Sequence, residues 1–140
     1  MCADVDPDAA ARVTRRLYEA LSAADMAAFV ALLDPSVTWT VPGRHSLAGT
    51  SRGLDAVLAH LGEVAQRTGG RIRLDLVEVL AGEAQAAAVV DVEISMDGRT
   101  AQDRQVHVIE VRNGRVVSLR EYHGDEAAMQ SLVDGDSLGT

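Results

Sequence analysis

The side chains best suited to chemistry in this sequence are four histidines, and their spacing limits what they could do. They are His45, His60, His107 and His123. None belongs to an H-x-H or H-E-x-x-H motif, in which a single element presents two imidazoles to one metal ion. The sequence therefore predicts no metal site, and one could form only if the fold brought distant residues together.

Lysine is absent, and all 13 basic residues are arginine. This composition excludes Schiff-base chemistry on lysine and a lysine-anchored pyridoxal cofactor. The sequence also contains no G-x-G-x-x-G or Walker-type loop, so nothing in it supports a nucleotide cofactor. We therefore expect no cofactor at all. The alanine- and arginine-rich, lysine-free composition is typical of bacteria with GC-rich genomes.

The net charge and the single cysteine limit which partners and which cellular compartment are expected for the protein. The formal net charge is −8, which opposes binding to nucleic acid or to an anionic membrane. Cys2 is the only cysteine and cannot form an internal disulfide. No secretory signal is recognised, and the longest apolar run, 26–33, is too short to span a bilayer. These features favour a cytoplasmic protein with neither nucleic-acid nor membrane partners.

Three helices are predicted in the first half of the chain. Asp6, followed by a proline, is suited to cap the first helix, whose apolar residues recur every three or four positions. Asp25 caps a short second helix, which ends at Asp34 and the proline after it. The clearest helical stripe covers 54–65, and Gly69 ends that third helix.

The rest of the chain has the pattern of strands separated by turns. Residues 37–41 alternate apolar and polar side chains around Trp39, as in a strand with one buried face. Asp97-Gly98 and Asn113-Gly114 are signals for hairpin turns. Four further strands are predicted at 71–80, 85–96, 100–112 and 115–122.

This order of elements predicts a single α+β domain over residues 1–140, with 1–6 and 134–140 disordered. Helices gathered at the front of the chain and hairpins behind them indicate helices on one face of a bent antiparallel sheet. Such a sheet can curl around its helices and leave a conical cavity between them.

Three stretches of the sequence resemble a known family. They are LYEALSAADMAAFVALLDPSVTWTVPG, AGTSRGLDAVLAHL and HVIEVRNGRVVSLREYHGD. Together they resemble the SnoaL-like, polyketide cyclase-like branch of the nuclear transport factor 2-like (ketosteroid isomerase-like) superfamily. The resemblance implies a cone-shaped, cystatin-like α+β barrel, with three N-terminal helices packed on a curved antiparallel sheet. The loop 42–53 would then cross the mouth of the cone, and Thr50 or Ser51 would cap the third helix.

The superfamily contains polyketide cyclases, ketosteroid isomerases, epoxide hydrolases, dehydratases and binding domains without catalytic activity, so the resemblance does not fix the function. Two of these chemistries lack residues that they need. Val41 and Val106 stand where ketosteroid isomerases carry acids. Val106 also replaces the Asp of the Arg-x-Asp motif of epoxide hydrolases, whose Arg is matched by Arg104.

The turn at Asn113-Gly114 allows the facing of the last two strands to be predicted. A two-residue loop pairs Val106 with Glu121, so these two share one face and His107 lies on the other. A shift of one residue would exchange the two faces. A β-bulge would therefore be needed for His107 and Glu121 to serve one site.

The preceding turn decides on which face Arg104 lies. A three-residue turn at Asp97-Gly98 is preferred here, because it groups more apolar side chains and sets Arg104 beside Glu121. A strict two-residue turn would instead place the apolar face on the side of His107.

On this register Glu121 is the leading candidate for a general base. In the cyclases that the chain resembles, an Asp near the end of the last strand takes a proton from an acidic carbon. Burial of Glu121 among aliphatic side chains would raise its pKa towards a useful value. Arg104 would orient the substrate or stabilise an oxyanion, and His107 falls where these cyclases carry an assisting histidine. The alternatives are an edge ion pair between Glu121 and Arg104, and a dimer-interface role for His107.

Further side chains are expected to line the pocket. Trp39 offers a flat apolar surface for a polycyclic ligand, with plain core packing as the alternative. The predicted substrate-binding residues are Trp39, Tyr18, His45, Val106, Val108, Leu119 and His123.

These predictions combine into a small cofactor-independent enzyme that catalyses a proton-transfer reaction. Cyclisation or isomerisation of a hydrophobic, carbonyl-bearing, polyketide-like molecule is the expected form. The alternatives are a small-molecule-binding or dimerisation module without catalysis, and an epoxide hydrolase-like or dehydratase enzyme. A homodimer through the outer face of the sheet is expected, because Ile109, Val111 and Val116 would lie there.

Overall fold

The computed structural model describes residues 8–135. The predicted cap Asp6 lies outside this range, as do 1–6 and most of the predicted disordered tail. Asp134 and Gly135 are described, and they are the last residue and the C-cap of a helix that follows Asp125, where the sequence predicts one or two helical turns. No helix among the described residues is both long and apolar enough to cross a membrane.

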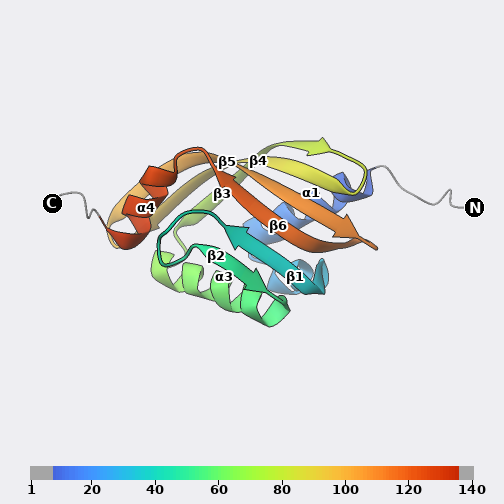
Figure 1. Ribbon diagram of the computed structural model, residues 1–140, viewed down its shortest axis with the longest axis horizontal. Coiled ribbons are helices and arrows are strands. Elements are labelled where there is room, and N and C mark those ends of the chain that lie inside the picture. The colour runs from blue at the N-terminus through green and yellow to red at the C-terminus, as the bar shows by residue number, and fades with distance from the viewer. Residues whose placement is uncertain (1–7, 136–140) are drawn as a thin grey trace, which may run out of the picture.

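Six strands form one curved sheet that does not close into a barrel (Figure 1). Their order across the sheet is β2-β1-β6-β5-β4-β3. The strands are β1 (Leu33–Val41), β2 (Gly49–Arg52), β3 (Ile72–Ala81), β4 (Gln85–Met96), β5 (Arg99–Arg112) and β6 (Arg115–His123). All neighbours are antiparallel except β1 and β6, which run parallel. The predicted α+β class, with helices packed on a curved, mainly antiparallel sheet, is confirmed.

Four helices accompany the sheet. The helices are α1 (Ala9–Ser22), α2 (Met26–Ala31), α3 (Leu54–Thr68) and α4 (Glu126–Asp134). Helix α1 packs against β3, β4 and β5, α3 packs against β1 and β2, and α4 contacts β4 and β5. Asp25 caps α2 as predicted, since its carboxylate accepts a hydrogen bond from the Ala28 N–H at 3.1 Å.

Two local predictions around the mouth of the fold are wrong. Thr50 and Ser51 belong to β2, a short strand paired with β1, so neither caps α3. The N-cap of α3 is instead Gly53, whose N–H donates to the Val37 carbonyl at 2.7 Å. Strand β1 also begins at Leu33 rather than at the predicted residue 37, and its pairing with β6 is irregular between Leu33 and Thr38, where a proline can be accommodated.

Both hairpin turns close with two residues. Asp97 and Gly98 have φ values of 53° and 79°, and Asn113 and Gly114 have 54° and 77°. Positive φ at both central residues is the type I′ geometry, which Asp adopts nearly as readily as Asn. The predicted three-residue turn at Asp97-Gly98 is therefore wrong, and Arg104 pairs across the sheet with Asp91.

A β-bulge in β6 corrects the predicted register of the last hairpin. Val111 pairs with Val116, but the next pair is Glu110 with Ser118, so one extra residue is inserted in β6. Beyond the bulge, His107 lies directly opposite Glu121. The prediction that these two residues face opposite sides is wrong, because the insertion shifts every later residue of β6 by one position.

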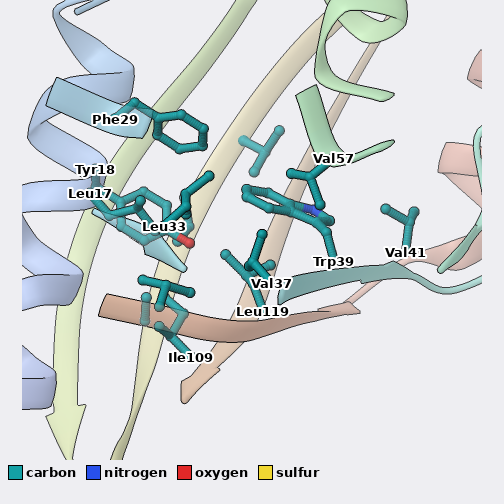
Figure 2. Packing of buried hydrophobic residues seen from close by; sticks show 14 of the residues in the cluster. Leu17, Tyr18, Phe29, Leu33, Val37, Trp39, Val41, Val57, Ile109 and Leu119 are labelled. Carbon is teal, nitrogen blue, oxygen red and sulfur yellow. The ribbon is translucent and has the colours of Figure 1, made fainter. Parts of the chain in front are cut away.

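The core lies between the inner face of the sheet and helices α1, α2 and α3. Figure 2 shows Trp39 beside Val37, Val57 and Leu119, with Phe29 on the α2 side. The Phe29 and Trp39 rings are tilted by 53° with centroids 6.3 Å apart. Three residues predicted for an outer dimer surface are buried in this core instead, namely Ile109, Val111 and Val116.

The core position of Phe29 leads to a prediction about stability. Phe29 is 0% exposed, whereas Met26 on the same helix is 46% exposed. Phe29→Ala should lower the free energy of unfolding by about 3–5 kcal/mol through lost burial and a residual cavity. The matched change Met26→Ala should alter it by no more than about 0.5 kcal/mol. Urea titration followed by circular dichroism measures both, and equal losses would contradict this assignment of the core.

Candidate active site

A small cavity lies among α3, α4, the loop 42–48 and the ends of β4 and β6. Its volume is about 90 Å³. Most of its wall is aliphatic or sulfur-containing, and its polar side chains are three histidines and one carboxylate. The lining residues are Val41, His45, Leu47, His60, Leu61, Val64, Ile94, Met96, Glu121, His123, Met129 and Val133.

Glu121 lines this cavity, and both of its carboxylate oxygens are hydrogen-bonded. The Trp39 Nε1–H donates to Oε2 at 2.8 Å, and His123 Nε2 lies 2.8 Å from Oε1. Strand geometry explains the arrangement. Side chains two positions apart on β6 share a face, so Glu121 and His123 project inward together. The parallel neighbour β1 sets Trp39 opposite Leu119, one step along the same face.

The pKa of Glu121 lies below its ordinary value, although the side chain is only 15% exposed. Burial alone would raise this pKa. The hydrogen bond from His123, the proximity of His107 and the hydrogen bond from Trp39 outweigh that effect. The predicted upward shift is therefore wrong. An ionised carboxylate with both oxygens occupied is better suited to orient His123 than to accept a proton from a substrate.

His123 presents an unpartnered nitrogen. A carboxylate can only accept, so the His123 nitrogen beside Glu121, Nε2, carries the hydrogen. In the neutral ring Nδ1 is then a free acceptor. Within the described part of the chain this atom is buried and has no hydrogen-bond partner. The His123 side chain is 2% exposed, which places a potential base in a nearly dry surrounding.

His45 presents the complementary group. The Leu47 N–H donates to His45 Nδ1 at 3.1 Å, so Nε2 of the neutral ring carries the hydrogen. Nε2 is buried and has no partner among the described residues. Burial is the main cause that lowers the pKa of His45, which keeps the ring neutral at pH 7. His45 packs closely against Gly43, where φ is +109° and an added Cβ would lie 3.2 Å from the imidazole Cδ2.

The two histidines that line this cavity thus leave one acceptor nitrogen and one donor N–H without a partner in the described part of the chain. A base beside a hydrogen-bond donor can remove a proton from carbon and stabilise the charge that develops on oxygen. A neutral imidazole can serve as that donor. Among residues 8–135, no three His, Cys, Asp or Glu side chains are grouped as a metal ion would require.

Comparison with known proteins gives the family. The family model for the SnoaL-like domain matches residues 14–119. The chain belongs to the SnoaL-like family. A relative in Mycobacterium tuberculosis, an uncharacterised protein, is 34% identical over 126 residues, which span 89% of this chain and 96% of the relative.

Solved structures of similar proteins support the same fold. Bal32a, from a soil-derived mobile gene cassette, is similar with a TM-score of 0.87 and 28% identity, covering 91% of this chain and 98% of its own. TerC, co-crystallised with polyporic acid, is similar with a TM-score of 0.79 and 23% identity, covering 90% of this chain and 98% of its own. At that identity TerC shows the fold alone.

His107 of this SnoaL-like protein belongs to a second buried network. The Tyr18 hydroxyl donates to His107 Nδ1, and His107 Nε2 lies 2.8 Å from the Gln105 side-chain oxygen. The Gln105 amide continues to Asp103 at 3.3 Å. Burial, then the charge of Glu121, raises the Tyr18 pKa well above its ordinary value, and burial lowers that of His107. Both His107 nitrogens are occupied, so this residue is not free to exchange a proton with a ligand.

Other predicted site residues lie away from the cavity. Arg104 forms a two-pronged ion pair with Asp91 on the outer face, with distances of 2.7 and 2.9 Å. Val106 and Val108 are on that face too, because the two-residue turn and the bulge exchange the predicted sides. Trp39 and Leu119 pack in the core beneath the cavity rather than on its wall.

Two parts of the site were missed by sequence reasoning. His60 lines the cavity from α3, and its place in the same stripe as Leu61 and Val64 was a signal for it. Helix α4 supplies Met129 and Val133. Helical turns after Asp125 were expected from the sequence, but none of their residues was assigned to the site.

The depressed pKa of Glu121 gives a pH-dependent prediction. A carboxylate whose pKa is lower in the folded state stabilises the fold above its unfolded value, and the effect is lost as the pH falls through the folded value. Glu121→Gln should lower the free energy of unfolding by about 1–3 kcal/mol at pH 6. That difference should shrink as the pH drops below about 4.3, where the unfolded carboxylate protonates.

Urea titrations at pH 6, 4.5 and 3.5 measure this difference. The matched control is Glu110→Gln, which removes an exposed carboxylate 3.7 Å from Arg112. The control should change stability by less than about 1 kcal/mol at pH 6. A gap between wild type and Glu121→Gln that widens from pH 4.5 to pH 3.5 would contradict the assigned direction.

Proposed function

We propose that this SnoaL-like protein is an enzyme that transfers a proton within a small carbonyl compound and needs no cofactor. His123 is the base, Glu121 orients it, and His45 donates a hydrogen bond to the substrate oxygen. One observation carries the proposal: His45 and His123 both line one largely apolar cavity, and each has a buried imidazole nitrogen with no partner among the described residues. Unpartnered buried polar atoms are unfavourable, and their presence at one place points to a ligand that completes them.

The proposed reaction begins with removal of a proton from the carbon next to a carbonyl. His123 Nδ1 accepts the proton, and the C–H electron pair becomes the carbon–carbon double bond of an enolate. The carbonyl oxygen gains the charge and accepts a hydrogen bond from His45 Nε2–H. Ionised Glu121 stabilises the His123 imidazolium, as a carboxylate does in other His–acid pairs.

Two products are open to this enolate. Return of the proton from His123 to a different carbon gives an isomer. Attack of the enolate carbon on a second carbonyl of the same molecule forms a carbon–carbon bond and closes a ring, and the new alkoxide takes the proton. Both outcomes need only the groups already described, because neither changes the oxidation state of the molecule as a whole.

The cavity constrains the substrate. An apolar protein cavity of about 150 Å³ is large enough for benzene, and the cavity here is about 90 Å³. The part of the substrate held beside His45 and His123 is therefore a few non-hydrogen atoms across, and the aliphatic wall favours a neutral group. A polycyclic polyketide would need the loop 42–48 and α4 to separate. TerC, which shares the fold, was co-crystallised with polyporic acid, and this supports a test of cyclic carbonyl compounds.

A binding module without catalysis is the second candidate. The small cavity and the fully bonded Glu121 favour it, since a ligand could satisfy both imidazoles and undergo no reaction.

A homodimer through the outer face also stays a prediction. That face now carries half-buried Val106 and Val108 and exposed Tyr122, and sedimentation equilibrium measures the association.

The proposed function is tested by hydrogen exchange in D2O. Cyclic and acyclic ketones, diketones and quinones are incubated with the protein, and NMR follows loss of the proton next to each carbonyl. Wild type should accelerate exchange of at least one compound. His123→Asn should then lower the rate by about 10²–10⁴-fold, as expected for loss of a general base. His45→Asn should lower it by about 10²-fold, as expected for loss of an oxyanion donor.

The matched control is Arg73→Gln, which removes an exposed ion pair with Asp75 on β3 and should leave the exchange rate unchanged. Full exchange activity in His123→Asn would overturn the assignment of the base. Saturable binding of a compound whose protons never exchange faster than in buffer would favour the binding module.

A further inference from the structure

We propose that Arg67 is a positioning residue that links helix α4 to the loop carrying His45. Through this link, the packing of α4 over the cavity and the orientation of the His45 N–H depend on each other. The proposal deepens the function proposed above and rests on it for its catalytic consequence. Its structural content can be tested without any substrate.

The guanidinium of Arg67 joins three segments. Arg67 lies in the last turn of α3 and is half-buried. Its Nη1 donates to the Ser46 hydroxyl at 2.9 Å, and its Nη2 donates to the Val133 carbonyl at 2.7 Å. The Ser46 N–H also donates to the Asp134 carboxylate at 3.2 Å. The residue next to His45 is thereby bonded to the end of α4 both directly and through Arg67.

These bonds affect the cavity because the two segments that they join both line it. Helix α4 places Met129 and Val133 on the cavity wall, while the loop 42–48 places His45 and Leu47 there. The last carbonyls of a helix have no partner within the helix, and an arginine from elsewhere can satisfy them. Without Arg67, the end of α4 and the His45 loop would each lose a charge-assisted hydrogen bond at the same place.

The geometry calls for arginine at this position. A guanidinium holds its donors in a rigid planar fork and can reach two acceptors at once, whereas a lysine ammonium is a compact charge on a flexible stem. The two acceptors here belong to segments far apart in the sequence, Ser46 and Val133. Arg67→Lys should therefore keep one bond and lose the other.

Arg99 provides a matched control within the same structure. Its Nη2 donates to the Leu132 carbonyl at 2.9 Å, one residue from the carbonyl that Arg67 binds. Its ion-pair partner is Asp97, at 3.8 Å, in the β4–β5 turn and not in the loop of His45. Arg99→Met should weaken the end of α4 without releasing the loop. Ser46→Ala is the converse, since it removes the loop acceptor and leaves both arginine bonds to α4.

The test measures how fast diethyl pyrocarbonate carbethoxylates each histidine of the full-length protein, with peptide mapping by mass spectrometry. His45 is 6% exposed and should react slowly in wild type. Arg67→Met should speed modification of His45 about tenfold, the change expected for loss of a charge-assisted hydrogen bond. Ser46→Ala should speed it by a similar or smaller factor, and Arg99→Met by less than about twofold.

His107 is the internal control for folding. It is 4% exposed and bonded within its own network, so its modification should stay slow in every variant that remains folded. Should Arg67→Met fail to fold, Ser46→Ala and Arg67→Lys carry the test. Equal rates for His45 in Arg99→Met and Arg67→Met would overturn the proposal, because Arg67 would then act only as a cap on α4. An unchanged His45 rate in Ser46→Ala would overturn it too.

The catalytic consequence has a separate readout. For any compound that exchanges in D2O, Arg67→Met should lower kcat towards the level of His45→Asn. The double variant should be no slower than His45→Asn alone, because residues that act through one group are not additive. Carbethoxylation as expected, with no exchange activity in wild type, would keep the Arg67 proposal and reject the proposed function.

Discussion

A carboxylate held inside an apolar core must be fully hydrogen-bonded, and that requirement organises one end of this sheet. Glu121 meets it with an indole N–H from β1 on one oxygen and an imidazole N–H from its own strand on the other. An uncompensated charge in such surroundings would be strongly unfavourable. The parallel pairing of β1 with β6 brings Trp39 within reach, and the inward side of β6 brings His123. The cavity, the orientation of His123 and the proposed chemistry all follow from that arrangement.

The hydrogen bonds of the buried histidines determine which of their nitrogens stay available. Once Glu121 has fixed which His123 nitrogen carries the hydrogen, the other nitrogen is buried and has no partner among the described residues. His45 is fixed in the same way by a backbone N–H from Leu47. In His107, by contrast, both ring nitrogens are hydrogen-bonded, Nδ1 to Tyr18 and Nε2 to Gln105. Three buried histidines on one fold thus differ in their availability for chemistry because of single neighbouring groups.

Sequence patterns predicted the elements of the fold well and the facing of its side chains poorly. Features set by neighbouring residues could be predicted from the sequence, because turn residues and periodicity act locally. These were the asparagine–glycine turn, strand β4 and the end of α3 at Gly69. The bulge could not be predicted, since its residues have the pattern of an ordinary strand. They are Val116, Val117 and Ser118. Insertion of one residue in β6 brought His107 opposite Glu121. The two-residue turn at Asp97-Gly98 set the facing of β5, which places Arg104, Val106 and Val108 on the outer face. The resemblance to the family placed Glu121 near the end of the last strand, where the structure has it, but its hydrogen-bond partners depend on contacts between distant strands.

The place of α4 at the end of the described chain has a practical meaning for handling the molecule. Figure 1 shows α4 at one extremity of the structure and the start of α1 towards the other. Any polypeptide attached behind Asp134 sets off from the rim of the cavity, beside the bonds that Asp134 and Val133 make. An affinity tag or fluorescent fusion at that end would therefore disturb α4, which forms part of the cavity wall. A tag placed ahead of α1 would lie away from the site.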